Sequence, residues 1–338
     1  MRYQRKRTLT VAVVLILVLA ITLSSFFYLD SQKPYTGKTE SLTLGIYPSE
    51  FSSLIYIAND QGYFSTNGIK LILKDYTSGA SAVKGMLNGE VDIATASEFV
   101  VANNAMQNEG IYALGTVSKY LNLYLVARTD LGIHNISDLV GKKIGVALGS
   151  ANQFYLGRFL DLNGINQNQV TLVNVTFVDT PNELANGTID AAIIFQPYIN
   201  QIQNTLGDKI IMWPAQADQF GYFELICTKN WAALNQDLAV AFLKAIVQAE
   251  NFNIVHKVQA VAIVARDLNY TDSYVESIWP GYQYTVTLDQ SFIVLMQDEA
   301  RWLISNNLTS TTTIPNFINY VYPDGLKSVK PDAVNIIG

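Results

Sequence analysis

The stretch Asn88-Gly-Glu-Val-Asp-Ile-Ala94 returns 98 residues later as Asn186-Gly-Thr-Ile-Asp-Ala-Ala192. In each copy a glycine ends a helical pattern, and an apolar run typical of a strand begins directly afterwards. A repeat of this kind predicts two similar α/β lobes. In α/β folds, ligands bind at the carboxyl ends of the strands, where the amino termini of helices also converge. We therefore expect a cleft between two lobes and predict that the chain binds a ligand there.

The amino terminus predicts attachment to a membrane. Residues 1–8 are basic, and residues 9–29 then run without a charge, which is long enough for a spanning helix of about 20 residues. We predict an uncleaved transmembrane anchor, and a signal peptide cleaved near Thr22-Leu-Ser24 is the alternative. The basic flank places residues 1–8 in the cytoplasm by the positive-inside rule, and the chain beyond about residue 30 outside. Residues 30–40 are expected to form a linker.

The composition fits a protein with two cores that does not bind nucleic acid. Of the 338 residues, 49% are hydrophobic and 15% are charged, which is enough apolar material for two lobes. Four of the 22 Lys and Arg lie in the amino-terminal segment, and the remaining 18 stand against 28 Asp and Glu. This acidic balance disfavours nucleic acid as a partner. Cys227 is the only cysteine, so no intramolecular disulfide can form, and its apolar neighbours predict a buried thiol.

Apolar and alternating runs predict the path of the chain through the lobes. The run at 120–128 is long enough to cross from the first lobe to the second, and the run at 221–227 would return the chain. These two crossover strands are expected to form a hinge that lets the lobes close around a ligand. The strongly helical stretches 238–255, 258–268 and 288–306 are expected to pack on the first lobe. The predicted division assigns residues 41–126 and 223–338 to lobe 1 and residues 127–222 to lobe 2. The other predicted strands are 41–47, 68–73, 91–96, 143–147, 173–178 and 191–195.

Polar residues that begin helices follow several of these strands. Helix amino termini carry unpaired N–H groups and a partial positive charge, so such loops suit an anionic or polar ligand. A serine there is also an ordinary helix cap, and only its recurrence at several strand ends points to a ligand. In the loop Leu148-Gly-Ser-Ala-Asn-Gln-Phe154, glycine lets the backbone approach a ligand. The candidate ligand-binding residues are Ser49, Ser52, Ser53, Ser78, Gly79, Ser97, Glu98, Gly149, Ser150, Asn152, Gln153, Phe195, Gln196 and Tyr198.

Four carboxylates have distinct expected roles. Glu98 and Glu224 stand beside the expected cleft, and either could receive the ammonium group of a zwitterion or pair with a nearby Lys or Arg. Asp92 and Asp190, in the two repeat copies, stand at strand starts away from the cleft and are expected to be structural.

Aromatic residues cluster in sequence around the cleft loops. Most of them are expected in the core, and a subset could stack on a ligand.

The sequence does not indicate catalysis, a cofactor or a bound metal. His134 lies in a turn, His256 lies in a helical run, and no group of His, Asp and Glu has the spacing of metal ligands. The nucleophile elbow Gly-X-Ser-X-Gly and the Walker motif are both missing. The chain is therefore predicted to be a binding protein and not an enzyme. An enzyme that acts through a pair of carboxylates stays open, because such a pair can come together only in the folded protein.

The order and spacing of several motifs resemble the substrate-binding proteins of ABC importers, in particular the nitrate/sulfonate/taurine branch. The resemblance covers residues 41–335 and implies a type II periplasmic-binding fold. Its lobes would close on a small organic anion or zwitterion and hand it to a permease served by ATPase subunits. The motifs are Gly62-Tyr-Phe64 with Asn67-Gly-Ile69, Leu87-Asn-Gly-Glu-Val-Asp-Ile-Ala94, Ser137-Asp-Leu-Val-Gly-Lys-Lys-Ile-Gly-Val146 and the second repeat copy.

The same resemblance leaves other functions open. Related proteins of this fold bind a thiamine-precursor pyrimidine for uptake, and a ligand-sensing role through a separate protein is a further alternative. Pyrimidine synthases share the fold, but they carry a cysteine-rich motif with histidines that this chain lacks. Sulfonate binders hold the anion with backbone amides and neutral side chains, which fits the loop around Gly149. The lipid-attachment motif of bacterial binding proteins is missing, so the helix at 9–29 would have to tether the protein.

Overall fold

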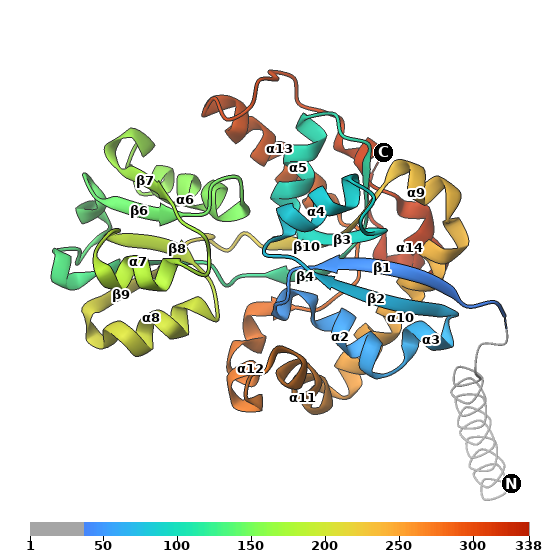
Figure 1. Ribbon diagram of the computed structural model, residues 1–338. Coiled ribbons are helices and arrows are strands. Elements are labelled where there is room, and N and C mark those ends of the chain that lie inside the picture. Colours follow the sequence, from blue (N-terminus) through green and yellow to red (C-terminus); the bar gives the residue numbers. More distant parts are fainter. Residues whose placement is uncertain (1–36, 338) are drawn as a thin grey trace, which may run out of the picture.

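The chain folds into two α/β lobes, each built on one sheet, and passes between them twice (Figure 1). This computed structural model describes residues 37–337. The predicted cytoplasmic segment 1–8, the predicted membrane helix 9–29 and residues 30–36 of the predicted linker lie outside the described residues. The last linker residues lead directly into the first strand, which begins at Glu40.

The first lobe holds a six-stranded sheet with the order β11-β4-β10-β3-β1-β2. Strand β1 pairs in parallel with β2 and β3, whereas β10 runs antiparallel to β3 and β4. Because β1, β2 and β3 run in one direction, their carboxyl ends lie along the same edge of the sheet. The strands are β1 (Glu40–Ile46), β2 (Ile69–Asp75), β3 (Ile93–Ser97), β4 (Ile111–Tyr120), β10 (Gly221–Thr228) and β11 (Tyr282–Gln283).

The second lobe holds a five-stranded sheet with the order β7-β6-β8-β5-β9. Strand β6 is parallel to β7 and β8, and β5 is antiparallel to β8 and β9. Apart from β11, this repeats the order of the first lobe. In both sheets the antiparallel strand beside the parallel ones has just crossed from the other lobe. The strands are β5 (Tyr124–Arg128), β6 (Lys143–Val146), β7 (Thr171–Asn174), β8 (Ala191–Ile194) and β9 (Ile210–Pro214).

The sequence repeat corresponds to a repeated set of hydrogen bonds. Asp92 Oδ2 accepts the N–H of Thr43 on β1 at 2.7 Å, and Asp190 Oδ2 accepts the N–H of Lys143 on β6 at 2.8 Å. The backbone N–H of each aspartate donates to the carbonyl of the same partner, at 2.9 and 2.8 Å. Both aspartates thus join the third parallel strand of a lobe to its first. This agrees with the structural role expected from the sequence.

The passages between the lobes are short segments. The predicted strand at 120–128 is divided, since β4 ends at Tyr120 and β5 begins at Tyr124 in the second sheet. The chain therefore crosses at 121–123, and residues 124–126 pair in the second sheet, although the expected division placed them in lobe 1. The return passage is 215–220, and the run expected to cross there is strand β10 of the first sheet.

One side chain links the two passages. The Oε1 atom of Gln216 accepts the backbone N–H groups of Asn122 at 2.9 Å and Leu123 at 3.0 Å. Its Nε2 atom donates to the carbonyl of Tyr120 at 3.0 Å. These bonds satisfy buried polar groups where the backbone has left both sheets. The two connecting segments are therefore bound to each other between the lobes.

Most helices cover the first lobe. Helix α10 packs on α2 and α14, α13 packs on α5, and buried Phe242, Leu243 and Ile246 give α10 its core-facing side. Within residues 37–337, α10 is the one helix long and apolar enough to cross a membrane, but here it is part of the lobe. The helices of lobe 1 are α2 (Ser53–Asp60), α3 (Tyr63–Thr66), α4 (Gly79–Leu87), α5 (Glu98–Met106), α9 (Lys229–Leu234), α10 (Gln236–Val255), α11 (Lys257–Leu268), α12 (Asp272–Ile278), α13 (Gln290–Ser305) and α14 (Pro323–Val329). Those of lobe 2 are α6 (Ala151–Leu162), α7 (Thr180–Asn186) and α8 (Tyr198–Leu206).

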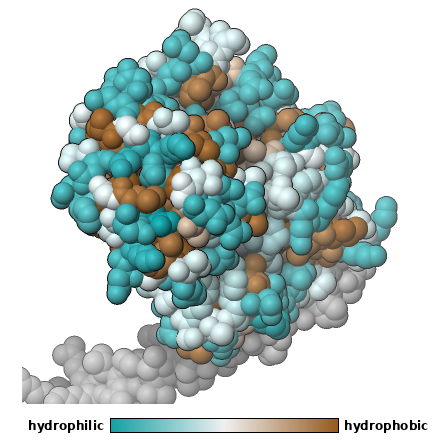
Figure 2. Space-filling model, turned by 60° about the vertical axis from the view of Figure 1, so that its left-hand side comes forward, coloured by the Kyte–Doolittle hydropathy of each residue, from teal (hydrophilic) through white to brown (hydrophobic). Residues whose placement is uncertain are grey.

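The outer surface is mixed in character. Figure 2 shows apolar residues scattered among polar ones on the face turned to the viewer, rather than gathered into one continuous patch. Scattered apolar residues are normal on a folded surface.

Candidate ligand-binding site

A cleft of about 580 Å³ lies between the two lobes. Lobe 1 contributes the loops that follow β1, β2 and β3, and lobe 2 contributes those that follow β6, β7 and β8. All six loops leave the carboxyl ends of parallel strands. This is the edge at which the sequence analysis placed the binding site.

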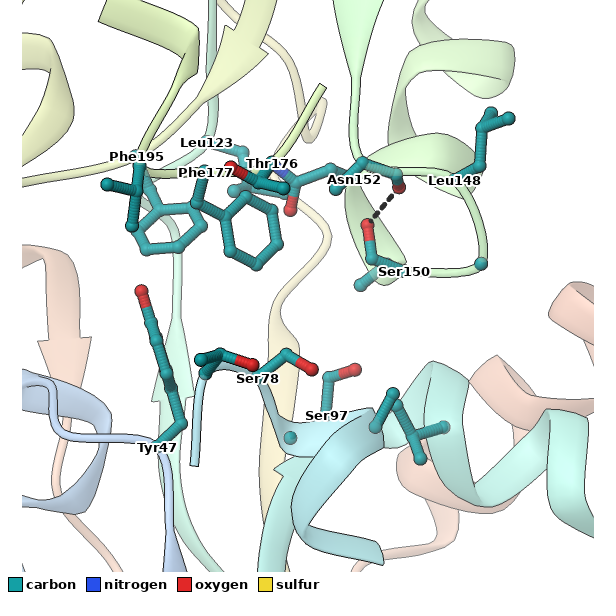
Figure 3. Close-up of a pocket in the computed structure, with 18 of the residues that line it drawn as sticks. Tyr47, Ser78, Ser97, Leu123, Leu148, Ser150, Asn152, Thr176, Phe177 and Phe195 are labelled. Carbon is teal, nitrogen blue, oxygen red and sulfur yellow. Dashed lines mark hydrogen bonds between the residues drawn. The ribbon is translucent and has the colours of Figure 1, made fainter. Parts of the chain in front are cut away.

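Three helices from the two lobes begin at the cleft, each behind a serine. Helix α4 follows Ser78, α5 follows Ser97 and α6 follows Ser150, and all three serines line the cleft. The first N–H groups of a helix have no carbonyl partner within it, and the helix dipole adds partial positive charge there. Figure 3 shows Ser78 and Ser97 on one side of the gap and Ser150 on the other. The cleft can therefore offer hydrogen-bond donors from both lobes to one polar or anionic group.

Local hydrogen bonds hold these helix starts in place. Ser78 Oγ accepts the N–H of Ser81 at 3.1 Å, and Ser81 Oγ accepts the N–H of Ser78 at 3.0 Å, which makes a capping box. The Ser150 hydroxyl donates to the Ala147 carbonyl at 2.6 Å. Because the side chains of Ser78 and Ser150 are engaged with their own loops, α4 and α6 offer mainly the backbone N–H groups at their first positions to the cleft, whereas the Ser97 side chain does not cap α5.

Glycine is needed at two of these turns. At Gly79, the start of α4 approaches β3 so closely that a Cβ atom would lie 2.7 Å from Ala96 Cα. Gly149 has a φ of 75°, in the left-handed region that side chains disfavour. Its N–H donates to Gln153 Oε1 at 2.8 Å. Both glycines keep a helix amino terminus at the wall of the cleft.

Aromatic rings form one end of the cleft. Tyr47 of lobe 1 lies there with Phe177 and Phe195 of lobe 2 (Figure 3). The ring centroids are 6.3 Å apart for Tyr47 and Phe177, and 5.0 Å apart for Phe177 and Phe195. Phe51 extends this wall, 5.5 Å from Phe195 and 5.1 Å from Phe223. The rings are tilted to one another, by 52° for Tyr47 and Phe177 and by 68° for Phe177 and Phe195, and together they present an apolar surface that water solvates poorly.

The cleft lining carries almost no formal charge. Among the described residues that line it there is no Lys, Arg or His. Asp179 is the one charged residue in this set; it is exposed, it precedes helix α7, and its Oδ2 accepts the Thr176 hydroxyl at 2.6 Å. A bound anion would therefore be neutralised by backbone dipoles rather than by a cationic side chain.

Half of the predicted site residues line the cleft. Ser49, Ser52 and Ser53 do not, because they lie at the turn before α2 and are buried. The Ser49 hydroxyl donates to the Tyr47 carbonyl at 3.2 Å, and the Ser53 hydroxyl donates to the Glu50 carbonyl at 2.6 Å. The predicted residues that do line the cleft are Ser78, Gly79, Ser97, Gly149, Ser150, Asn152 and Phe195.

Glu98 was predicted as a ligand contact, but it is fully buried beneath the cleft. Its carboxylate accepts the Tyr222 N–H at 2.9 Å, the Tyr120 hydroxyl at 3.2 Å and, from lobe 2, the Tyr155 hydroxyl at 3.4 Å. Burial raises the pKa of Glu98 to about 7, and the nearby carboxyl of Glu299 is shifted upward for the same reason. Glu98 therefore joins the lobes instead of facing a ligand.

Glu224, the other carboxylate considered for an ammonium group, is buried as well. Its Oε1 accepts the Thr116 hydroxyl at 2.6 Å, and burial raises its pKa to about 8. It does not line the cleft. A ligand ammonium group would therefore find no carboxylate within the cleft apart from Asp179 at its edge.

The remaining predicted residues support the site indirectly. Gln153 turns back to hold the Gly149 N–H. Gln196 Oε1 accepts the N–H of Asn200 at 3.1 Å and the hydroxyl of Tyr274 in lobe 1 at 3.4 Å. The hydroxyl of Tyr198 lies 3.0 Å from that of Tyr47, across the lobes. Gln153 thus holds a loop, whereas Gln196 and Tyr198 join the lobes. None of these three residues lines the cleft.

The loop at 174–179 lines the cleft throughout but was not among the predicted site residues. Residues 173–178 were predicted to form a strand, but β7 ends at Asn174, opposite Val146, where β6 also ends. Beyond Asn174 the chain has no neighbouring strand to pair with, and it forms part of the cleft wall. The helix start at Thr180-Pro181 could have indicated this loop, because a strand must end some residues before a helix begins.

No group of three or more His, Cys, Asp and Glu side chains within residues 37–337 is placed to hold a metal ion. Cys227 is buried, as predicted, and neither it nor the two histidines lines the cleft. Apart from the Asp179 carboxylate, the chemistry of the lining is therefore that of hydroxyls, amides, backbone N–H groups, aromatic rings and aliphatic side chains.

Comparison with known proteins identifies relatives and the fold. A family model described as NMT1/THI5 like matches residues 51–260. A putative thiamine biosynthesis protein of Haemophilus influenzae is 26% identical over 223 residues, which is 65% of this chain and 70% of that protein. A putative aliphatic sulfonates-binding protein of Bacillus subtilis is 25% identical over 262 residues, 73% of this chain and 76% of that protein.

The fold is shared with solved structures. The alkanesulfonate-binding protein SsuA from Xanthomonas axonopodis pv. citri, bound to MOPS, superposes with a TM-score of 0.72 at 16% identity. The match covers 89% of this chain and 100% of that one. This confirms the predicted α/β periplasmic-binding-protein-like fold with two sheets. It also confirms the resemblance to sulfonate-type binding proteins on which the sequence analysis drew.

Proposed function

The chain belongs to the NMT1/THI5-like family, and from that premise we propose that it is the extracytoplasmic solute-binding component of an ABC importer. It captures a small organic anion between its lobes and delivers the anion to a permease driven by ATPase subunits. The predicted helix at 9–29 would keep it at the outer face of the membrane. The likeness to sulfonate-binding proteins supports this class of ligand.

The observation that carries the proposal is the convergence of three helix amino termini on one cleft. Helices α4 and α5 start on the lobe 1 side and α6 starts on the lobe 2 side. An anion between them accepts hydrogen bonds from both lobes, so its binding favours the closed arrangement. Closure removes water from the anion, and the fixed N–H dipoles then take the place of its hydration shell.

Contacts on either side of the cleft already join the lobes. On one side the hydroxyls of Tyr47 and Tyr198 meet at 3.0 Å, and on the other the Tyr155 hydroxyl reaches Glu98. The short passages at 121–123 and 215–220 provide the hinge. Opening would break these contacts and expose the cleft, and closing on a ligand restores them.

A pyrimidine related to thiamine is a second candidate ligand. The aromatic end of the cleft, with Tyr47, Phe177 and Phe195, suits a flat heterocycle, and one relative is named as a putative thiamine biosynthesis protein. Such a ligand is neutral, so it would bind through ring contacts and hydrogen bonds without using the helix dipoles as a counter-charge. This difference allows the two candidates to be separated by experiment.

A negative charge introduced at Ala80 distinguishes an anionic ligand from a neutral pyrimidine. Ala80 is exposed, lines the cleft and lies in the first turn of α4. Ala80→Asp stabilises the helix start but places a negative charge in the cleft, whereas Ala80→Asn has nearly the same shape and no charge. Two unit charges about 8 Å apart at an effective dielectric constant of about 20 repel by about 2 kcal/mol, so anion affinity should fall about 30-fold.

The measurement is isothermal titration of the full-length chain, purified in nonionic detergent, with methanesulfonate, taurine, nitrate, bicarbonate and hydroxymethylpyrimidine. An anion that binds the parent and the Ala80→Asn variant within about threefold, but binds the Ala80→Asp variant about 30-fold more weakly, supports the proposal. Equal binding of an anion to all three proteins places it elsewhere and rejects the proposal. Binding of the pyrimidine alone, with equal affinity for both variants, would establish the second candidate.

A further inference from the structure

We propose that the ligand is an organic anion that carries a flat apolar group and no ammonium group. The anionic head lies at the starts of α4, α5 and α6, and the apolar group lies against Tyr47, Phe177 and Phe195. This inference rests on the proposed function, because it describes the ligand of the same cleft. It excludes taurine-like zwitterions and small inorganic anions as the preferred ligands.

The two ends of the cleft differ in chemistry. Figure 3 shows the rings of Tyr47, Phe177 and Phe195 gathered at one end, while Ser97 and Ser150 face each other further along. Tyr47 comes from lobe 1 and the two phenylalanines from lobe 2, just as the helix starts come from both lobes. A ligand that fills both ends touches each lobe twice. A ligand with only an anionic head leaves the half-buried rings of Tyr47 and Phe177 facing water, whereas Phe195 is already buried by the protein.

Two exposed aliphatic residues also line the cleft. Leu148 and Val178 line the cleft and remain 48% and 66% exposed. Each stands on a lobe 2 loop beside residues of the polar end, namely Ser150 and Thr176. Exposed aliphatic side chains around a polar end gain burial only if the bound molecule has apolar surface of its own.

The charges argue against a zwitterion. Glu98 and Glu224, which could have received an ammonium group, are buried beneath the lining and bonded to protein hydroxyls. Asp179 stands at the edge of the cleft and already accepts the Thr176 hydroxyl. An ammonium group enclosed by the closed lobes would lose its hydration without gaining a buried counter-charge, which disfavours binding.

The size of the cleft argues against a small ion. Its volume of about 580 Å³ lies in the range of about 300–1,000 Å³ that is typical of sites for drug-sized ligands. Nitrate or bicarbonate would occupy a small fraction of that space, and the aromatic end would stay filled with water. A fused or single ring joined to an anionic head fits both the volume and the division of the lining.

The test compares anions that share a head but differ in their apolar part. The full-length chain is titrated with naphthalene-2-sulfonate, benzenesulfonate, 2-naphthoate, methanesulfonate, taurine, nitrate and the neutral 2-naphthol. We expect naphthalene-2-sulfonate or 2-naphthoate to bind at least 30-fold more tightly than methanesulfonate, taurine, nitrate and 2-naphthol. The sulfonate and carboxylate arms show which head the cleft prefers.

Substitution at the aromatic end locates the apolar group. Phe177 is half-buried and lies on a loop outside the regular structure of lobe 2. Phe177→Ala should weaken aryl anion binding at least tenfold and change methanesulfonate binding less than threefold. Phe252→Ala is the matched control, because Phe252 is a half-buried phenylalanine on α10 that does not line the cleft. That variant should bind every anion as the parent does.

The outcomes separate this inference from the proposed function. Methanesulfonate or taurine binding as tightly as the aryl anions would overturn the inference and leave the anion-binding function standing. Equal loss of aryl and methyl sulfonates in the Phe177→Ala variant would overturn it in the same way. Binding of 2-naphthol with the affinity of its anionic analogues would overturn both. Failure of every anion to bind would also reject the proposed function.

Discussion

Replacing the buried Glu50 with glutamine should stabilise the protein at neutral pH. Glu50 is fully buried in the turn after Tyr47, and neither of its carboxylate oxygens has a hydrogen-bond partner within ordinary distance among residues 37–337. Burial raises its pKa from 4.5 to about 7, although the Tyr282 hydroxyl acts in the opposite direction. Below that pH the folded protein holds a neutral acid, which glutamine matches closely in shape and charge.

The sign and size of the effect follow from this pKa. In the unfolded chain Glu50 releases its proton near pH 4.5, whereas the folded chain retains it until about pH 7. The stability that Glu50 contributes is therefore fully present below pH 4.5 and is lost as the pH rises to about 7. A rise of about 2.5 pKa units corresponds to a loss of about 3 kcal/mol, as an order of magnitude. Glutamine does not titrate, so the Glu50→Gln variant escapes this loss.

The assay is guanidinium chloride unfolding of the parent and the variant at pH 4.5, 5.5, 6.5 and 7.5, followed by tryptophan fluorescence. The two proteins should have similar free energies of unfolding at pH 4.5, and the variant should gain up to about 3 kcal/mol by pH 7.5. Glu276→Gln, an exposed substitution on α12, is the control and should leave the pH dependence unchanged. A Glu50→Gln variant that is less stable than the parent by the same amount at every pH would refute the reasoning. That result would mean that Glu50 is ionised and paired in the folded protein.

Two further predictions concern the lobe contact and the thiol. A Cβ atom at Gly157 on α6 would lie 2.6 Å from the indole nitrogen of Trp302 on α13, so Gly157→Ala should hinder the approach of the lobes and weaken ligand binding severalfold in titration. Unchanged affinity would show that the lobes tolerate a wider spacing there. Cys227 is fully buried and burial raises its pKa to about 12, so a thiol reagent should leave the folded chain unmodified and label one thiol after unfolding. Rapid labelling of the folded chain would contradict this burial.

The sequence could predict where the cleft lies because that position depends on local patterns. A parallel strand followed by a glycine or serine and then a helix places the helix start at the strand's carboxyl end. This logic found the loops at Ser78, Ser97 and Ser150, which all line the cleft. The repeated sequence motif could be recognised for the same reason. In both lobes it makes the same turn after a helix, and its aspartate accepts a backbone N–H of the first strand.

The direction of individual side chains could not be predicted in this way. Ser49, Ser52 and Ser53 follow β1 as expected, but a 3₁₀ turn at Glu50–Ser52 rotates them into the protein. Glu98 is buried because tyrosines from β4, β10 and α6 converge on it. Those partners are 22, 124 and 57 residues away in sequence, so no local pattern shows them.

Strand β4 was not predicted from the sequence, again because long-range contacts decide which of its side chains are buried. Its polar residues Thr116 and Ser118 interrupt an apolar run, yet both are buried. The Thr116 hydroxyl donates to Glu224 and the Ser118 hydroxyl donates to the Phe51 carbonyl at 3.0 Å. Their burial is acceptable because tertiary partners satisfy them, and these partners are known only once the fold is formed. The end of β7 likewise depends on where its neighbour β6 ends.

Three predicted site residues that do not line the cleft join the two lobes, which gives them a place in the proposed binding mechanism. Tyr198 meets Tyr47, Gln196 accepts the Tyr274 hydroxyl, and Glu98 accepts the Tyr155 hydroxyl, and each of these bonds joins the two lobes. If the lobes close on a ligand as proposed, the free energy of these bonds is part of the apparent ligand affinity. A polar residue at the start of a cleft helix can therefore affect binding by contacting the ligand or by contacting the opposite lobe. Tyr47 combines both kinds of contact. Its ring lines the cleft, and its hydroxyl oxygen is hydrogen-bonded to the hydroxyl of Tyr198 in the other lobe. A flat group bound against that ring would favour the bond between the lobes, which links recognition of the ligand's apolar part to closure.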